Sequence, residues 1–290
     1  MAVEAHAPSA GEYIVHHLTH LGNREATGLI DFSVIHWDSV FFSIVLGALG
    51  CWVMWLVARS MSAGVPGRLQ AAVELLVEMV DREAKGIVHN EKSRRLVAPM
   101  ALSVFVWVVL LNTMDLLPVD LLPRIWAWMF GVAGHDPEHA YLRVVPTADI
   151  SVTMGLSISV LLAVLIYSIK IKGLGGWLHE LYGVPFGTKP GWAAPLLVPF
   201  NLLFNAIEYI SKPLSHSLRL FGNMYAGEIM FLLIAMLAAA GVASSGYWST
   251  ILGGVFQIVW IFFDGFIALL QAYIFMMLTI AYIAMAHEQH

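Results

Sequence analysis

The sequence predicts an all-α polytopic membrane protein with five membrane crossings, and three observations support this fold class. Hydrophobic residues make up 59% of the 290 positions and charged residues only 12%, whereas soluble domains carry about 25% charged residues. The mean hydropathy of the chain is +0.76. The sequence also contains five separate apolar segments, each long enough to cross a hydrocarbon core about 30 Å thick.

The first three crossings are predicted at about residues 39–58, 97–117 and 150–170. The polar segment before them, 1–37, lacks the basic and apolar regions of a signal peptide, so we expect the first crossing to act as its own insertion signal. Between the first two crossings, apolar residues recur at helical spacing over about residues 68–88. This pattern predicts an amphipathic helix that lies on the membrane surface.

The last two apolar segments, about 195–241 and 251–286, are longer than a simple crossing needs. At 1.5 Å per residue, helices of these lengths would reach roughly 70 Å and roughly 54 Å. An ordinary tilt does not fit such lengths into a membrane. We therefore predict a steeply tilted helical hairpin that turns through residues 241–249, with bends at Pro213 and Gly222 as the alternative.

The basic residues outside the crossings indicate the orientation of the chain. Most of them lie between the first and second crossings and before the fourth, while the loop between the second and third crossings carries only Arg124 and Arg143 beside several aspartates. The positive-inside rule therefore predicts an external N-terminus and a cytoplasmic C-terminus. We expect a single membrane domain over residues 38–290, preceded by the external segment 1–37.

Arg219 lies inside the fourth apolar segment and is the last lysine or arginine of the chain. An arginine at the centre of a membrane helix costs roughly 2.5–3.5 kcal/mol on insertion scales, and such residues usually mark the pathway of an ion or a substrate. Because arginine stays protonated under working conditions, Arg219 is a permanent charge rather than a proton carrier.

Polar residues form stripes on the last two predicted helices. One stripe of the fourth segment repeats at steps of three and four residues and contains Glu208, Lys212, Ser215, Arg219 and Asn223. Glu228 lies nine positions after Arg219 and therefore on the opposite face. On the fifth segment, Gln257, Asp264 and Gln271 repeat every seven residues, with Tyr282 close to the same line. We expect the arginine stripe to face a partner and Glu228 to meet the polar stripe of the fifth segment, where two carboxylates could exchange protons.

The run SKPLSHSLRLFGNMYAGE at residues 211–228 closely resembles the signature of subunit a of the F-type ATP synthase. Other segments agree in order and spacing: VFFSIVLG at 40–47, SAGVPGRLQ at 62–70, NTMDLLPVDLLP at 112–123, LRVVPTAD at 142–149, YSIKIKGLGG at 167–176 and QAYIFMMLTIAYIAMA at 271–286. The resemblance covers nearly the whole chain from about Asp38 and is closest to the proteobacterial form.

The resemblance implies a non-catalytic stator subunit of the bacterial inner membrane, with a periplasmic N-terminus and a cytoplasmic C-terminus. Its implied partners are the c-subunit ring, the b-subunit peripheral stalk, the rest of the ATP synthase complex and membrane lipids. No cofactor is implied. The chain has no nucleotide-binding loop of the Walker type, so we expect no direct nucleotide binding. The net charge of −5 gives no indication of nucleic acid binding.

The resemblance also assigns roles to individual residues in proton translocation. Arg219 corresponds to the essential charge between two offset half-channels, which favours deprotonation of an arriving ring carboxylate and blocks a direct leak. The periplasmic half-channel would contain Asn223, Glu228, Asp264 and Gln271, and its vestibule Asn112, Asp115 and Asp120. Ser215, Glu208 and Lys212 would border the cytoplasmic exit.

Two positions depart from the family pattern. Asp264 stands where the best-known proteobacterial pattern has a histidine, so a carboxylate pair of Glu228 and Asp264 would replace a carboxylate–imidazole pair, with one member protonated. The family's glutamate fourteen residues before the arginine is Asn205 here, while Glu208 appears on the arginine stripe. The residues of the exit path therefore stay open.

Other interpretations stay open for several residues. Asn112, Asp115 and Asp120 fit plain interfacial positions as well as channel positions, and Asp38 fits a helix cap. An ion-coupled secondary transporter would also bury charges, but it usually shows internal repeats, which this sequence lacks. The twelve histidines are scattered without HExxH-type spacing, so no metal site is expected.

Overall fold

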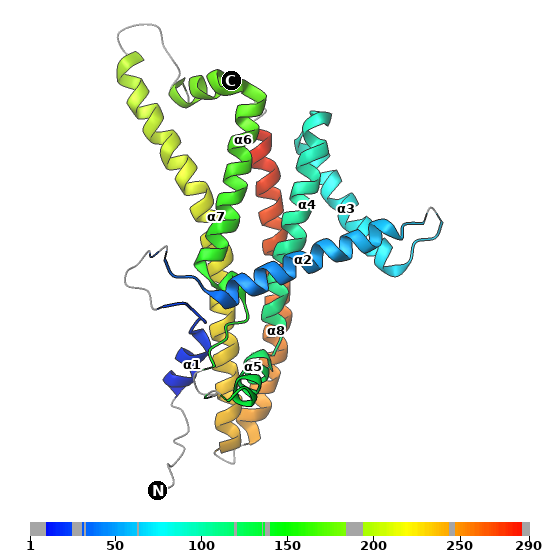
Figure 1. Cartoon of the computed structure of the whole chain (residues 1–290), viewed down its shortest axis with the longest axis vertical. Helices are drawn as coiled ribbons and strands as arrows, with labels where there is room; N and C mark the ends of the chain where they lie inside the picture. Colours follow the sequence, from blue (N-terminus) through cyan, green and yellow to red (C-terminus); the bar gives the residue numbers. More distant parts are fainter. Residues whose placement is uncertain are drawn as a thin grey trace. The chain divides into compact units, whose positions relative to one another are not determined.

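The computed structural model describes residues 10–24, 31, 33–62, 64–118, 121–134, 136, 140–183, 194–243 and 247–285. Within these residues the regular structure is helical, apart from an isolated β-bridge between Gly22 and His36 (Figure 1). The elements in chain order are α1 (Ala10–Leu18), α2 (Trp37–Arg59), α3 (Arg68–Ile87), α4 (Glu91–Thr113), η1 (Met114–Leu116), α5 (Leu121–Val132), η3 (Pro146–Ala148), α6 (Ile150–Gly183), α7 (Ala194–Ala243) and α8 (Tyr247–Met285).

The predicted fold class is confirmed. By length and composition, five of the described helices are apolar enough to cross a membrane, at Trp37–Arg59, Ser93–Leu116, Ile150–Gly183, Leu197–Ala239 and Tyr247–Met285. The predicted amphipathic helix is also present as α3, in which Val80 and Ala84 are buried while Leu75 on the same helix is exposed. Its position on the membrane surface stays a prediction.

Three helical features were not predicted. The N-terminal segment contains the short helix α1, and the apolar helix α5 lies between the second and third crossings. The third crossing continues to Gly183 and changes direction at Gly173, which has φ +72° (Figure 1). A positive φ of this kind is readily adopted by glycine because it has no Cβ. α7 extends from Ala194 to Ala243 with Pro213 inside it, and the alternative of bends at Pro213 and Gly222 stays a prediction.

The chain divides into two compact units, each made of several chain segments. The first unit consists of Met1–Gly50, Trp107–Val152 and Phe221–Leu270, and the second of Cys51–Val106, Thr153–Leu220 and Gln271–His290. In the first unit, Val145, Ala148, Met224 and Ala268 form a buried apolar cluster. This cluster joins η3 and its flank to α7 and α8, and it positions the polar groups described below.

The predicted hairpin of the last two helices is seen in the first unit. The hydroxyl group of Thr250 on α8 donates to the carbonyl group of Ala238 on α7 at 3.2 Å. At Gly253, a Cβ atom would lie only 2.7 Å from the Cβ of Ala238, so the glycine allows a close approach of the two helices. The predicted steep tilt in a membrane stays a prediction.

Candidate functional site

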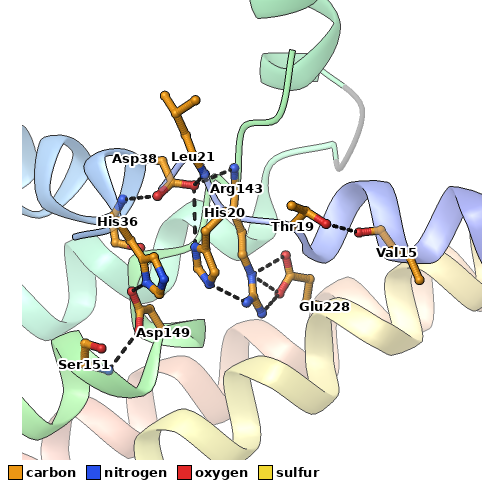
Figure 2. Close-up of polar contacts among 11 residues, drawn as sticks. Val15, Thr19, His20, Leu21, His36, Asp38, Arg143, Asp149, Ser151 and Glu228 are labelled. Carbon is orange, nitrogen blue, oxygen red and sulfur yellow. Dashed lines mark hydrogen bonds and ion pairs between the residues drawn. The ribbon is translucent and has the colours of Figure 1, made fainter. Parts of the chain in front are cut away.

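A buried ion pair between Arg143 and Glu228 lies in the first unit (Figure 2). The Nη2 atom of Arg143 is 2.6 Å from Oε2 of Glu228, and its Nε atom is 3.0 Å from the same oxygen. The two side chains are only 6% and 8% exposed. Charge-assisted contacts of this kind compensate the loss of hydration that both ions suffer on burial. Arg143 precedes η3 and Glu228 belongs to α7, so the pair ties a loop to the long helix.

The N-terminal segment adds a third group to this pair. Nε2 of His20 lies 2.8 Å from Nη1 of Arg143. Because a guanidinium group can only donate, Nε2 of His20 must accept this hydrogen bond, which places the proton of a neutral ring on Nδ1. That Nδ1 atom lies 3.5 Å from the carboxylate of Asp38. Figure 2 shows His20 between Asp38 and Arg143.

Asp38 joins three separate chain segments. Its Oδ2 atom accepts hydrogen bonds from the backbone N–H groups of Leu21 and Arg143, both at 3.1 Å. Its Oδ1 atom accepts from the backbone N–H of Ser39 at 2.8 Å. Asp38 lies in the first turn of α2. Because its carboxylate also binds the backbone of Leu21 and Arg143, it does more than cap its own helix.

Asp149, at the start of α6, is paired with His36. Nδ1 of His36 lies 2.7 Å from Oδ2 of Asp149, and the backbone N–H of Ser151 donates to Oδ1 at 2.9 Å. Burial of Asp149 alone would raise its pKa, but the hydrogen bonds from His36 and Ser151 outweigh burial and hold the pKa below its ordinary value. Asp149 is therefore a stable anion in the folded protein.

His20, His36 and Asp149 could in principle hold a metal ion, because one ligand atom from each lies within 4.8 Å of the others. The two imidazole rings, however, are stacked with centroids 4.1 Å apart and an angle of 5° between their planes. Each ring directs its nitrogen lone pairs within its own plane, so two stacked rings do not meet at one ion. In this arrangement His36 is bonded to Asp149, and His20 to Arg143.

A second acidic group surrounds Gly227 on α7. A Cβ atom at this glycine would lie 2.9 Å from Oδ2 of Asp115 in η1 and 3.0 Å from Oδ1 of Asp264 in α8. Both aspartates are buried, with exposed fractions of 4% and 1%. Among the described residues, the Oδ2 atoms of both side chains lack a hydrogen-bond partner. Two carboxyl groups from different helices therefore converge on one glycine.

A small cavity of about 30 Å³ adjoins these acidic groups. It is lined by His17, Met114, Asp115, Leu117, Pro118, Pro123, Leu142, Val144, Val145 and Glu228. This volume can accommodate a water molecule, and the polar groups in its wall could bind one. The cavity therefore brings a histidine of α1 and two carboxyl groups around one space.

The second unit contains Arg219. The side chain of Arg219 is exposed, while its backbone carbonyl accepts a hydrogen bond from Nε2 of Gln271 on α8 at 3.0 Å. Near the N-terminal half of α7, Lys212 forms an ion pair with Glu208 at 2.6 Å, and its Nζ atom lies 5.2 Å from the ring centre of Tyr282. Of the predicted stripe, Glu208, Ser215, Arg219 and Asn223 are exposed on the isolated chain.

The structure brings together some of the predicted site residues and separates others. Glu228 forms its ion pair with Arg143, whereas Asp264 converges with Asp115. Asn112 is fully buried and donates to the carbonyl group of Ala268 at 3.4 Å, and Asp115 is buried as well. Whether these two residues lie at the membrane interface or in a channel stays a prediction. Asp120 lies outside the described residues.

Sequence reasoning missed most of the network that holds Glu228. Arg143, His20, His36 and Asp149 received no role from their spacing. One signal was available for Arg143, which is one of only two basic residues in an otherwise acidic loop. The second unit contains another missed residue, His216, which is buried beside Phe275 with ring centroids 3.7 Å apart.

The proteins and the family model that resemble this chain all belong to one family. The family model described as ATP synthase A chain matches residues 40–284. The chain is 56% identical over 292 residues to "ATP synthase subunit a" of Paracidovorax citrulli (strain AAC00-1), and 56% identical over 292 residues to that of Acidovorax sp. (strain JS42). It is 51% identical to the protein of the same name from Verminephrobacter eiseniae (strain EF01-2). Each match covers 100% of both chains.

Proposed function

Because this chain belongs to the ATP synthase A chain family, we propose that it conducts protons through two offset half-channels and couples their flow to rotation of a c-subunit ring. It is a multi-pass membrane protein, since five of its described helices fit a membrane crossing. The relatives are bacterial proteins, which supports the inner membrane as its location. On this proposal the N-terminus faces the periplasm and the C-terminus the cytoplasm, as the basic residues indicate.

Arg219 is the observation that carries this proposal. It is a permanent cation within the 43-residue apolar span Leu197–Ala239, and its side chain is exposed on the isolated chain. An exposed arginine on an apolar helix needs an anionic partner to offset its cost in the membrane. A carboxylate on each c subunit would provide that partner, and the fixed charge would favour its ionisation while it passes.

The periplasmic half-channel is assigned to the polar groups of α4, η1, α7 and α8. Asp115, Glu228 and Asp264 would carry or stabilise protons there, and the cavity beside Asp115 would admit water. Asn223 and Gln271 would continue this path, and Asn112 would support it. The cytoplasmic exit is assigned to Ser215, Glu208 and Lys212, of which the last two form an ion pair.

In this function the chain is a stator and carries out no chemical catalysis. The c-subunit ring would move against it, and the b-subunit peripheral stalk would hold it in place. Each proton that crosses a potential of 100 mV releases about 2.3 kcal/mol. The rotating ring would transmit this free energy to the catalytic head of the complex.

Replacement of Arg219 tests the proposal. In proteoliposomes that contain the whole complex, we expect Arg219→Ala to abolish ATP synthesis driven by a proton gradient. The matched control is Arg82→Ala, because Arg82 is an arginine on α3 with 73% of its side chain exposed. Synthesis at the wild-type rate in the Arg219→Ala complex would contradict the proposed role.

A further inference from the structure

Asp115 and Asp264 approach Gly227 so closely that a larger residue at this position of α7 would not fit between them. One oxygen of each carboxyl group lies about 3 Å from the point where a Cβ would be, so the two oxygens are at most about 6 Å apart. An alanine methyl group would contact both of them at less than normal van der Waals distance. The glycine is therefore a condition for the approach of the two acids.

The charges around this site do not balance. Asp115, Asp264 and Glu228 provide three carboxyl groups, and Arg143 is engaged with Glu228 by contacts of 2.6, 3.0 and 3.3 Å. His17 also lines the cavity that Asp115 and Glu228 share. Two carboxylates within about 6 Å of one another in a buried site repel one another, which favours a state in which one of them holds a proton.

The two aspartates differ in their access to water. Both side chains are buried, but Asp115 lines the small cavity and Asp264 does not. A proton that arrives through the cavity would therefore reach Asp115 first. Glu228 also lines the cavity, but the guanidinium group of Arg143 contacts both of its carboxylate oxygens.

We propose that Asp115 and Asp264 form a proton-sharing pair across Gly227, beside the ion pair of Arg143 with Glu228. The pair holds one proton at rest. A proton from cavity water binds Asp115 as the O–H bond of Asp264 breaks, and the proton released from Asp264 moves on along the half-channel. The proton on Asp115 then passes to Asp264 as the O–H bond of Asp115 breaks. One proton has then entered, one has left, and the pair is back in its resting state. The role in transport rests on the proposed function.

The test compares Asp115→Asn and Asp264→Asn in liposomes that contain the membrane sector with its c ring. Passive proton conduction is measured against the external pH. Each substitution removes the repulsion that favours protonation of the other aspartate, so we expect both conduction profiles to move to lower pH by about one unit or more. The control is Asp81→Asn on α3, where an aspartate with 39% of its side chain exposed pairs with Lys85, and its profile should match the wild type.

The possible outcomes separate the two proposals. Shifts in the same direction for both variants support the pair, as does loss of conduction in both with normal assembly, since each carboxyl group is then indispensable. Unshifted profiles, opposite shifts, or loss of conduction in one variant alone would overturn the pair. Absence of conduction in the wild-type sector would instead overturn the proposed function.

A glycine substitution provides a second measurement. Gly227→Ala would push the two carboxyl groups apart, and we expect it to lower proton conduction at least tenfold. Gly155→Ala is the matched control, because a Cβ at Gly155 meets nothing within 4 Å. Equal conduction in the two variants would show that close approach of the aspartates is not required, and would overturn the proposal.

Discussion

Removal of Arg143 is expected to destabilise the protein strongly, because it leaves Glu228 buried without its counter-ion. The two side chains are 6% and 8% exposed, so water screens the pair poorly. Loss of one partner of a buried, hydrogen-bonded ion pair costs about 3–5 kcal/mol. We therefore expect Arg143→Gln to lower the free energy of unfolding by about this amount.

A double substitution separates the ion pair from other effects of Arg143. In Arg143→Gln combined with Glu228→Gln, neither charge is left unpaired, so we expect a smaller loss than the two single variants would give together. The difference defines the coupling free energy of the pair. The hydrogen bond from Arg143 to His20 is lost in both the single and the double variant, so its contribution cancels from this difference.

The assay is reversible unfolding of the purified subunit in detergent micelles, followed by the loss of helical signal with denaturant. Arg95→Gln on α4 is the control, because Arg95 contacts Glu91 at 2.8 Å but the two side chains are 78% and 65% exposed. Exposed pairs of this kind contribute about 0.5 kcal/mol or less. Equal losses for Arg143→Gln and Arg95→Gln, or an additive double variant, would refute the reasoning.

Two further predictions concern pH and helix packing. The pKa of Asp149 lies below its ordinary value of 3.8 in the folded protein. As the pH falls, Asp149 is therefore protonated in the unfolded chain before it is protonated in the folded one. The stability that Asp149 contributes is present above pH 3.8 and is lost as the pH falls through the lowered pKa. Asp149→Asn should flatten this acid limb of stability measured against pH, and an unchanged limb would exclude the role of His36. Gly253→Ala should lower the free energy of unfolding by about 1–3 kcal/mol, because the new methyl group overpacks against Ala238. Gly254→Ala is the control and should be neutral or stabilising, since a Cβ at Gly254 meets nothing within 4 Å. Equal free energies of unfolding for the two variants would contradict the close approach of the helices.

The membrane class and the long helices could be predicted because their signals are local. Hydropathy over some twenty residues identifies a crossing, and helical periodicity places Arg219 and Glu228 on opposite faces of one helix. The structure agrees, with Arg219 exposed and Glu228 buried. The helices α1 and α5 were missed because they are short and lie in segments interpreted as loops, and the bend of α6 depends on the φ of Gly173 alone.

By itself, the sequence determined that this protein is a five-crossing member of its family with a fixed charge on the fourth crossing. Only the tertiary structure decided which acids meet. Arg143 and Glu228 are 85 positions apart, and His36 and Asp149 are 113 apart. Periodicity defines the direction of a side chain around its own helix, but not the register or rotation of that helix against another. The pairing of Asp115 with Asp264 depends on that packing, and on the missing side chain at Gly227 that permits it.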